Sequence, residues 1–290
     1  SSKKDEEDKV LNNASALWTR DKKDITADQY KEFYHHVGMA YDDPWLTLHN
    51  KAEGLISYIN LLFIPSNRPY DLFNPDRKAN LKLYVRRVFI TDDCEGLIPP
   101  YLRFVKGIID TDDIDLNVSR EMLQNNPVVA KIKSAIIKRV ISELKKKANK
   151  DPEEFAKFWD AFGAVLKEGI HEDFTNRDKI LEVCRFKSSE SDKLISLDDY
   201  VSRMKDGQEK IYYVSGEDEN KLSQSPHLEG FKAKGIEVIY MTDPVDEFWL
   251  PSVGKFSEKD FQSITKGGAD LDKIKSDKKS KEKKKDNKNI

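Results

Sequence analysis

The chain has 290 residues, of which 38% are hydrophobic, 35% charged and 10% aromatic, and its formal net charge is −2. This balance excludes collagen-like, disulfide-scaffold and wholly disordered proteins, because the aromatic side chains supply material for a core. The densest apolar stretch, 55–64, still contains Ser57 and Asn60 and is shorter than the roughly 18 apolar residues that a membrane helix needs. We therefore expect a soluble globular protein.

The charges are unevenly distributed along the chain. The segment 273–290 holds nine Lys and three acidic residues, so the rest of the chain is net acidic. An acidic body is a poor platform for nucleic acid, and we expect no partner of that class. A lysine-rich run of this composition is typical of a disordered linker. Because the sequence begins without Met and stops inside this run, we expect a piece of a longer protein.

Cysteine and histidine usage predicts neither a disulfide framework nor a metal site. Cys94 and Cys184 are the two cysteines, and neither belongs to a CxxC pair of the kind that binds zinc. We expect both to be free thiols. The five histidines show no ligand spacing with another His, Cys or acidic residue.

The first predicted element is a helix over residues 24–34. Thr26 is a suitable N-cap, and Gln29, three residues later, completes a capping box.

Two strands are predicted next, over Leu55–Pro65 and Leu81–Thr91, with turn-forming Pro and Asn residues between them. The second segment alternates apolar and polar residues, which is typical of a half-buried strand. On a single strand Arg86 and Arg87 would point to opposite faces. One of them would then face inward or into a cleft.

Two helices follow in the middle of the chain. One is predicted over Pro127–Lys147, with Asn126 as the N-cap and Pro127 at the first helical position. The other opens at Pro152 and is expected to stop near Gly163. Four aromatic residues of this second helix are predicted to lie in the core: Phe155, Phe158, Trp159 and Phe162.

The last third alternates short helices and strands. The predicted elements are a helix over 197–204 capped by Ser196, a strand over 211–214, a helix over 226–234 and a strand over 236–241. Strand, helix and strand with short connections predict a βαβ unit in a partly parallel sheet.

The predicted fold class is α/β (α+β), with two α-β-α sandwich subdomains joined by a helical connector. The predicted boundaries are a disordered linker (1–10), a large α/β subdomain (11–149), the connector (150–187), a small α/β subdomain (188–265) and a disordered Lys-rich tail (266–290).

The common phosphate-loop, dinucleotide, serine-hydrolase and zinc-protease signatures are missing from the sequence. The segment 115–124 is more informative. If it contains a turn of helix, Arg120 and Gln124 share one face, while Met122 and Leu123 are buried opposite. A planar guanidinium beside an amide is suited to a phosphate or carboxylate. The alternative from the residues alone is a solvated Arg on an exposed helix.

Several segments, in order along the chain, resemble the middle segment of the heat-shock protein 90 chaperone family. They are 17–20 (LWTR), 63–65 (FIP), 83–91 (LYVRRVFIT), 103–107 (RFVKG), 116–124 (LNVSREMLQ), 198–204 (DDYVSRM) and 242–247 (TDPVDE). The likeness runs from about residue 11 to 265. Segments 159–169 and 207–213 are most similar to the bacterial form or an organelle relative.

The resemblance implies part of an ATP hydrolase with three domains. A separate N-terminal domain would hold ATP and Mg²⁺, and a C-terminal domain would form a homodimer. Arg120 would reach the γ-phosphate of ATP, with Gln124 and Asn117 accompanying it as catalytic residues. Asp115 stands where the family usually has Pro. The isolated fragment would be mainly monomeric and inactive.

The resemblance also implies binding of unfolded or partly folded client proteins, with no nucleic-acid or membrane partner. Tyr41, Trp45 and Trp249 are the candidate anchors, and Tyr41 stands where some members have Trp. The implied location is the cytoplasm, with an organelle matrix or plastid as the alternative. A non-catalytic module that only binds clients or partners is the rival interpretation.

Overall fold

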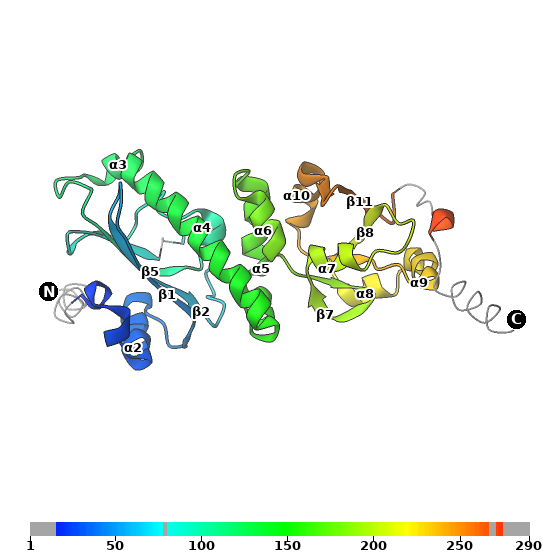
Figure 1. Cartoon of the computed structure of the whole chain (residues 1–290), viewed down its shortest axis with the longest axis horizontal. Coiled ribbons are helices and arrows are strands. Elements are labelled where there is room, and N and C mark those ends of the chain that lie inside the picture. Colours follow the sequence, from blue (N-terminus) through cyan, green and yellow to red (C-terminus); the bar gives the residue numbers. More distant parts are fainter. Residues whose placement is uncertain (1–15, 78–79, 267–270, 275–290) are drawn as a thin grey trace, which may run out of the picture. The chain divides into compact units, whose positions relative to one another are not determined.

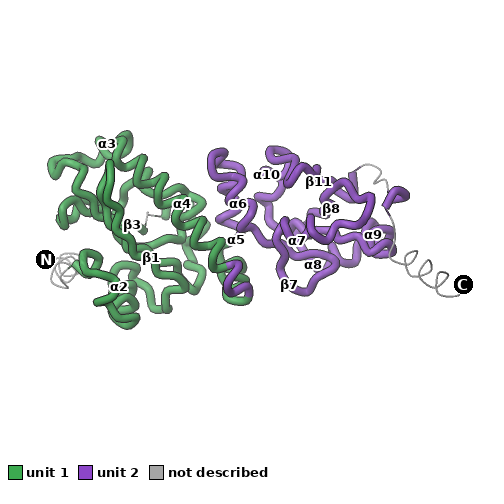
Figure 2. Tube along the Cα trace, viewed as in Figure 1, with its two compact units in different colours: residues 1–147, 153–162 green, residues 148–152, 163–290 purple. Residues whose placement is uncertain are grey.

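The computed structural model of the chain describes residues 16–77, 80–266 and 271–274. The chain divides into two compact units, shown in Figure 2: unit 1 comprises 1–147 and 153–162, and unit 2 comprises 148–152 and 163–290. The predicted linker, 1–10, and the predicted tail, 266–290, lie outside the described residues except for 266 and 271–274. Within the described residues, no helix is both long and apolar enough to cross a membrane.

Unit 1 contains a five-stranded mixed sheet with the strand order β1-β2-β5-β3-β4. Figure 1 labels its strands β1, β2 and β5. Neighbouring strands are antiparallel except β3 and β5, which are parallel. The strands are β1 (Pro44–Ala52), β2 (Tyr58–Pro65), β3 (Leu81–Val85), β4 (Val88–Thr91) and β5 (Lys106–Thr111). The helical elements are η1 (Leu17–Thr19), η2 (Lys22–Asp24), α2 (Ala27–Gly38), η3 (Pro100–Leu102), α3 (Arg120–Leu123), α4 (Pro127–Lys150) and the first part of α5 (Pro152–Glu172).

Both faces of this sheet are buried. Leu61 and Phe63 of β2 pack in one core cluster with Trp18 of η1 and Tyr34 of α2. Successive side chains of a strand point to opposite faces, so Leu62 lies on the other face, where it is also buried. The unit therefore has a layered α/β core.

Two helices of unit 1, α2 and α4, begin at the predicted N-caps, but both continue beyond their predicted ends. Thr26 caps α2 in a complete capping box with Gln29. The Asn126 side chain accepts hydrogen bonds from the Val128 and Val129 N–H groups at the start of α4. α5 does not stop at Gly163 but continues to Glu172, because buried apolar residues repeat through it at helical spacing: Val165, Leu166 and Ile170.

The segment 81–91 is a β-hairpin, and the prediction of one continuous strand was wrong. Tyr84 pairs with Phe89 and Val85 pairs with Val88, which leaves Arg86 and Arg87 as a two-residue turn. Both arginines have positive φ angles, 49° and 66°, as a type I′ turn requires. Their side chains are exposed at the tip, so neither faces inward.

Unit 2 contains a six-stranded sheet with the order β10-β11-β8-β9-β6-β7. The predicted βαβ unit is confirmed, because β8 and β9 are parallel with α8 and α9 between them. The strands are β6 (Phe186–Ser188), β7 (Ser191–Ile195), β8 (Lys210–Ser215), β9 (Ile239–Met241), β10 (Lys255–Phe256) and β11 (Lys259–Ser263). The helical elements are the rest of α5, α6 (Arg177–Val183), α7 (Leu197–Ser202), α8 (Glu219–Ser223), η4 (Pro226–Leu228), α9 (Glu229–Lys234), α10 (Asp246–Val253) and η5 (Leu271–Lys273).

Candidate functional site: an exposed arginine beside an edge strand

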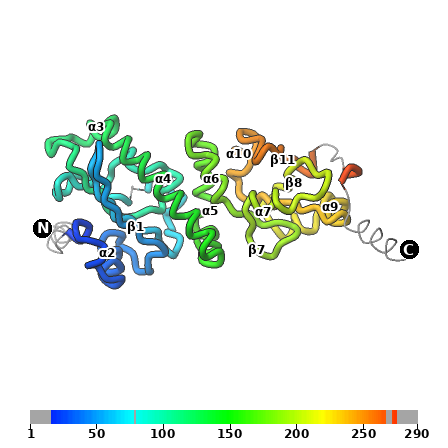
Figure 3. The backbone as a smooth tube through the Cα atoms, in the orientation of Figure 1, coloured from blue at the N-terminus to red at the C-terminus, as the bar shows by residue number. Residues whose placement is uncertain are grey.

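The predicted anion-binding residues lie between the last strand of the unit 1 sheet and its longest helix. After β5 the chain makes a turn that contains Asn117, then enters the single turn of α3, and Asn126 caps the start of α4. Figure 3 labels α3 and α4 along this stretch of the chain. Leu123 is 2% exposed and anchors α3 to the core. Met122 was predicted to be buried with it, but its side chain is 62% exposed because a single turn has only one inward-facing position.

Arg120 is the first residue of α3 and lies against the end of the edge strand β4. Its Nε and Nη2 atoms donate to Oγ1 of Thr91, at 3.3 and 3.4 Å. Nη2 is also 3.9 Å from a carboxylate oxygen of Asp92 and of Asp93. The Arg120 side chain is nevertheless 64% exposed, so its charge remains accessible to an anion from outside the unit.

Gln124 lies one helical turn after Arg120 and contacts the same part of the chain. Its Nε2 atom donates to Oε2 of Glu95 at 3.4 Å. Arg120, Gln124 and Asn117 are all exposed. The structure therefore brings Arg120 and Gln124 together beside residues 91–95, and it places Asn117 in the exposed turn that precedes them.

This arrangement fits phosphate oxygens better than a metal ion. A guanidinium and an amide present only N–H donors on their nitrogens, and charge-assisted donors of this kind bind phosphate. Within 16–77, 80–266 and 271–274, no group of three His, Cys, Asp or Glu residues could hold a metal ion.

The three candidate client-binding aromatics lie in different environments. The Tyr41 side chain is fully exposed in the loop after α2. Trp45 is partly buried: its ring stacks on Phe158 with the centroids 4.9 Å apart, and its Nε1 atom donates to the Glu154 carbonyl at 3.2 Å. Tyr41 alone of the three presents its whole ring to solvent.

Trp249 is fully buried, so the expectation that it is an exposed anchor was wrong. Its Nε1 atom donates to Oδ1 of Asp246 at 2.8 Å, and its ring meets the Phe261 ring edge-on. The preceding residue on α10, Phe248, is 63% exposed. Sequence reasoning missed Phe248 because the inward face of α10 is set by Asp246, a buried acid that looks like a surface residue in the sequence.

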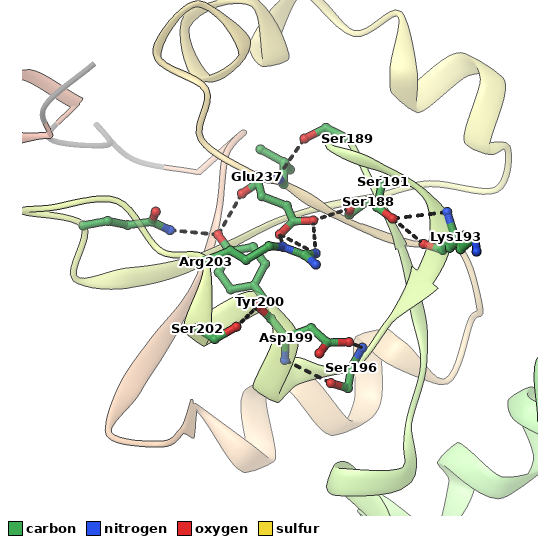
Figure 4. Close-up of polar contacts among 12 residues, drawn as sticks. Ser188, Ser189, Ser191, Lys193, Ser196, Asp199, Tyr200, Ser202, Arg203 and Glu237 are labelled. Carbon is green, nitrogen blue, oxygen red and sulfur yellow. Dashed lines mark hydrogen bonds and ion pairs between the residues drawn. The ribbon is translucent and has the colours of Figure 1, made fainter. Parts of the chain in front are cut away.

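A second polar cluster, in unit 2, is fully paired and structural (Figure 4). The buried Glu237 carboxylate accepts two hydrogen bonds from Arg203 Nη2, at 3.0 and 2.8 Å, and one from Ser188 Oγ at 2.5 Å. The Tyr200 hydroxyl donates to the Glu237 carbonyl and accepts from Gln208 Nε2. These contacts tie α7 and its C-cap Arg203 to β6 and to the segment that enters β9, and they account for this buried carboxylate structurally.

Both cysteines are free, as predicted, and both are buried. Burial raises the pKa of the Cys94 thiol to about 11 and that of the Cys184 thiol to about 12. Neither is suited to nucleophilic chemistry at neutral pH, since only the thiolate is reactive.

Comparison with known proteins decides the family. The family model described as Hsp90 protein matches residues 1–290. The chain belongs to the Hsp90 family. Among curated relatives, the chaperone protein HtpG of Paramagnetospirillum magneticum is 58% identical over 282 residues, and that of Rickettsia rickettsii is 53% identical over 262 residues. The match covers 97% of this chain and 45% of the first relative, and 90% and 42% for the second.

The chain therefore spans less than half the length of these curated HtpG relatives. A solved structure, the middle domain of a heat shock protein from Plasmodium falciparum, is 34% identical and superposes with a TM-score of 0.75. It covers 86% of this chain and 99% of its own. The resemblance to the Hsp90 middle segment and to its bacterial form is confirmed, and so is the mixed α/β class.

Proposed function

We propose that this chain is the middle domain of an ATP-dependent molecular chaperone, and that Arg120 acts on the γ-phosphate of ATP held by a separate N-terminal domain. The observation that carries the proposal is the position of Arg120. Its guanidinium is 64% exposed on the surface of unit 1, at the start of a helix that Leu123 fixes to the core. A cation in this position can contact an anion on another domain while unit 1 stays folded.

The proposed role follows from the charge of the transferred group. ATP, with Mg²⁺ in the N-terminal domain, supplies the phosphoryl group, whose oxygens carry charge that must be stabilised in the transition state. The Arg120 guanidinium is a planar cation that can direct two parallel N–H donors at phosphate oxygens. Gln124 would add a neutral amide donor beside it, and Asn117 would shape the turn that carries both.

Exposed aromatic residues support the client-binding part of the proposal. Tyr41 in unit 1 is fully exposed beside Met39, which is 72% exposed. In unit 2, Phe174 and Phe248 are 73% and 63% exposed. Exposed apolar side chains that gather in one patch mark interaction sites, and those of a chaperone would hold apolar segments of unfolded chains. We propose Phe248 as an anchor in place of the buried Trp249.

The family membership also supports the remaining parts of the proposal. The parent protein would be a cytoplasmic homodimer that is joined through a C-terminal domain, and its substrates would be unfolded or partly folded proteins. The 290-residue chain by itself would be mainly monomeric and would not hydrolyse ATP.

The decisive experiment is Arg120→Ala in the full-length protein, with ATP turnover and nucleotide affinity measured separately. We expect kcat to fall by at least about tenfold with little change in nucleotide Kd, because an interaction made mainly in the transition state affects kcat. Arg120→Lys should restore little of the ATP turnover, since the point charge of an ammonium does not reproduce the two parallel donors of a planar guanidinium. Arg139→Ala, which removes an exposed Arg from α4, is the matched control.

The second candidate function is a client-binding module without a catalytic residue, and the exposed aromatics alone would support it. The same experiment separates the two candidates. If full-length Arg120→Ala hydrolyses ATP at the wild-type rate, the catalytic role is excluded and the binding module remains.

A further inference from the structure

A short segment of unit 2, residues 271–274 (Leu-Asp-Lys-Ile), packs against the core of that unit, and we name it the clasp. It lies at the start of the lysine-rich run 273–290, which holds nine Lys and three acidic residues. We propose that the clasp is a separable piece of unit 2, which opens and closes while the rest of the unit stays folded. The lysine-rich run then begins either at a fixed point of unit 2 or on a longer free tether.

Two apolar side chains of the clasp contact the core. Ile274 is 4% exposed and belongs to one core cluster with Tyr212 of β8 and Phe231 of α9. Leu271 is partly buried and packs against the same cluster. Because apolar surface removed from water favours the packed state, these two side chains hold the clasp closed.

A lysine of α9 contacts the backbone of the clasp. Residues Leu271–Lys273 form the single 3-10 turn η5, and the Ile274 N–H donates to the Leu271 carbonyl at 3.1 Å. The Nζ atom of Lys234 donates to the same Leu271 carbonyl and, at 3.4 Å, to that of Ile274. The carbonyls at the end of a short helical turn have no partner within the turn, so this ammonium satisfies them.

Two glycines of unit 2 leave the space that the clasp occupies. At Gly207, in the turn before β8, an added Cβ would lie 2.5 Å from the Lys273 carbonyl oxygen. At Gly230 of α9, an added Cβ would lie 3.3 Å from a terminal methyl of Leu271. Any side chain at position 207 would therefore displace the backbone of the clasp.

The clasp is attached to unit 2 differently from the elements that it covers. β8 is bonded through its backbone to β9 on one side and to β11 on the other. The clasp adds no strand to this sheet, and its middle residues, Asp272 and Lys273, are exposed. Small pieces with few buried contacts open at a lower free energy than the core of a domain. We therefore expect the clasp to open much more often than the sheet.

Opening would change the length of the tether that follows unit 2. When the clasp is closed, the chain leaves the core at Ile274. When it is open, the last core residue before the tether is Ile264, and the chain between these two residues spans up to about 35 Å when extended. In the parent protein proposed above, the tether leads toward the C-terminal domain, so the clasp would set how far that domain can move from unit 2. Only this last step rests on the proposed function.

The test measures how fast a thiol placed in the clasp reacts in the 290-residue chain. Ile274→Cys puts the thiol in the core, and its labelling by dithiobis(nitrobenzoic acid) is followed by mass spectrometry of each site. The natural Cys184 is fully buried in unit 2 and reports opening of the core itself. We expect the introduced thiol to react at least about tenfold faster than Cys184. It should react at least about tenfold slower than a thiol placed by Asp272→Cys at an exposed position.

A second substitution should open the clasp from outside it. In the Ile274→Cys chain, Gly207→Ala should speed labelling at position 274 about tenfold and leave Cys184 unchanged, because the new methyl displaces the Lys273 carbonyl. Gly254→Ala is the matched control. Gly254 also has a positive φ, 68°, but no atom lies within 4 Å of an added Cβ, so the backbone is strained without a clash. This control should change neither rate.

Three results would overturn the proposal. Equal labelling rates at position 274 and at Cys184 would show that the clasp opens only when the core of unit 2 opens. Equal rates for the Ile274→Cys and Asp272→Cys chains would show that the clasp is not closed in solution. Equal acceleration by Gly207→Ala and Gly254→Ala would show that contact with the clasp is not the cause. None of these measurements involves ATP, so the proposed catalytic role of Arg120 stands or fails separately.

Discussion

Lys167 and Asp246 form an ion pair in the core of unit 2, with Nζ 2.8 Å from Oδ1 and side chains only 4% and 1% exposed. Asp243 supplies a second carboxylate at 2.6 Å, and Trp249 donates its indole N–H to the same Asp246 oxygen. Burial alone would lower the pKa of Lys167, but attraction to Asp246 and Asp243 outweighs it, so the pKa is raised and the ammonium stays charged. This network fixes the start of α10 on α5.

Removing the cation from this network should be strongly destabilising. We expect Lys167→Met to lower the free energy of unfolding by about 3–5 kcal/mol, because it leaves a buried carboxylate without its partner. The measurement is urea denaturation of the 290-residue chain, followed by a signal from unit 2. Lys255→Met, which breaks a 3.9 Å pair with the exposed Asp260, is the control and should change stability by less than about 0.5 kcal/mol. A loss below about 1 kcal/mol for Lys167→Met would contradict the network's structural role.

Substitutions at two adjacent residues of α10, Phe248 and Trp249, should affect client binding and stability separately. We expect Trp249→Ala to lower the free energy of unfolding by about 3–5 kcal/mol, since it empties a fully buried site. Phe248→Ala should leave stability within about 0.5 kcal/mol and should weaken binding of a permanently unfolded polypeptide by the full-length protein. Unfolding in urea and a binding titration measure the two effects. Unchanged affinity in Phe248→Ala would place the client contacts of unit 2 elsewhere.

The Phe248 and Trp249 pair illustrates what the sequence could not predict. Their order along the chain is known, but which of them faces the core depends on the Asp246–Lys167 contact, between residues 79 positions apart. By contrast, the helix starts at Thr26 and Asn126 were predictable, because an N-cap bonds to its own first turn. Helical spacing singled out Arg120 and Gln124, and the family resemblance supplied their proposed catalytic role. Their contacts with Thr91 and Glu95 came only from the structure, since each joins residues 29 positions apart.

The turn between β3 and β4 holds two non-glycine residues in a backbone conformation that favours glycine, and the free-energy cost of this conformation can be tested. Arg86 and Arg87 both have positive φ angles, a region that costs most non-glycine residues free energy. Asn and Gly suit a type I′ turn, so Arg86→Asn combined with Arg87→Gly should raise the free energy of unfolding of unit 1 by about 1 kcal/mol. The urea midpoint is the measurement. Arg86→Ala with Arg87→Ala removes the same charges without relieving the backbone, and an equal gain from that pair would contradict the explanation.

His49, on β1, should make unit 1 sensitive to mild acid. The ring is 7% exposed and uses both nitrogens: Nε2 lies 2.8 Å from the Trp18 carbonyl, and Nδ1 lies 2.7 Å from the Tyr30 hydroxyl. A carbonyl can only accept, so Nε2 carries the proton, and neutral Nδ1 accepts from Tyr30. Burial lowers the pKa of His49 below its ordinary value, although the bond to the Trp18 carbonyl opposes the shift.

The direction of the pH effect follows from that lowered pKa. In the unfolded chain His49 takes up a proton near its ordinary pKa of about 6.5, whereas in the folded chain it resists protonation to a lower pH. The unfolded state therefore binds more protons below about pH 6.5, and the stability present above that pH is lost as the pH falls toward the folded pKa. The loss is at most about 1.4 kcal/mol per pH unit for a single group.

The measurement is the free energy of unfolding of wild type and His49→Gln at pH 7.5 and 5.5. Gln keeps a donor for the Trp18 carbonyl but does not titrate, so we expect the variant to be less stable at pH 7.5 and the gap to narrow at pH 5.5. His227→Gln, at an exposed position of unit 2, is the control: the difference in free energy of unfolding between this variant and wild type should be the same at pH 7.5 and 5.5. If the difference in free energy of unfolding between wild type and His49→Gln does not change with pH, His49 takes up its proton alike in the folded and unfolded states. The buried neutral ring would then not be the source of any acid sensitivity.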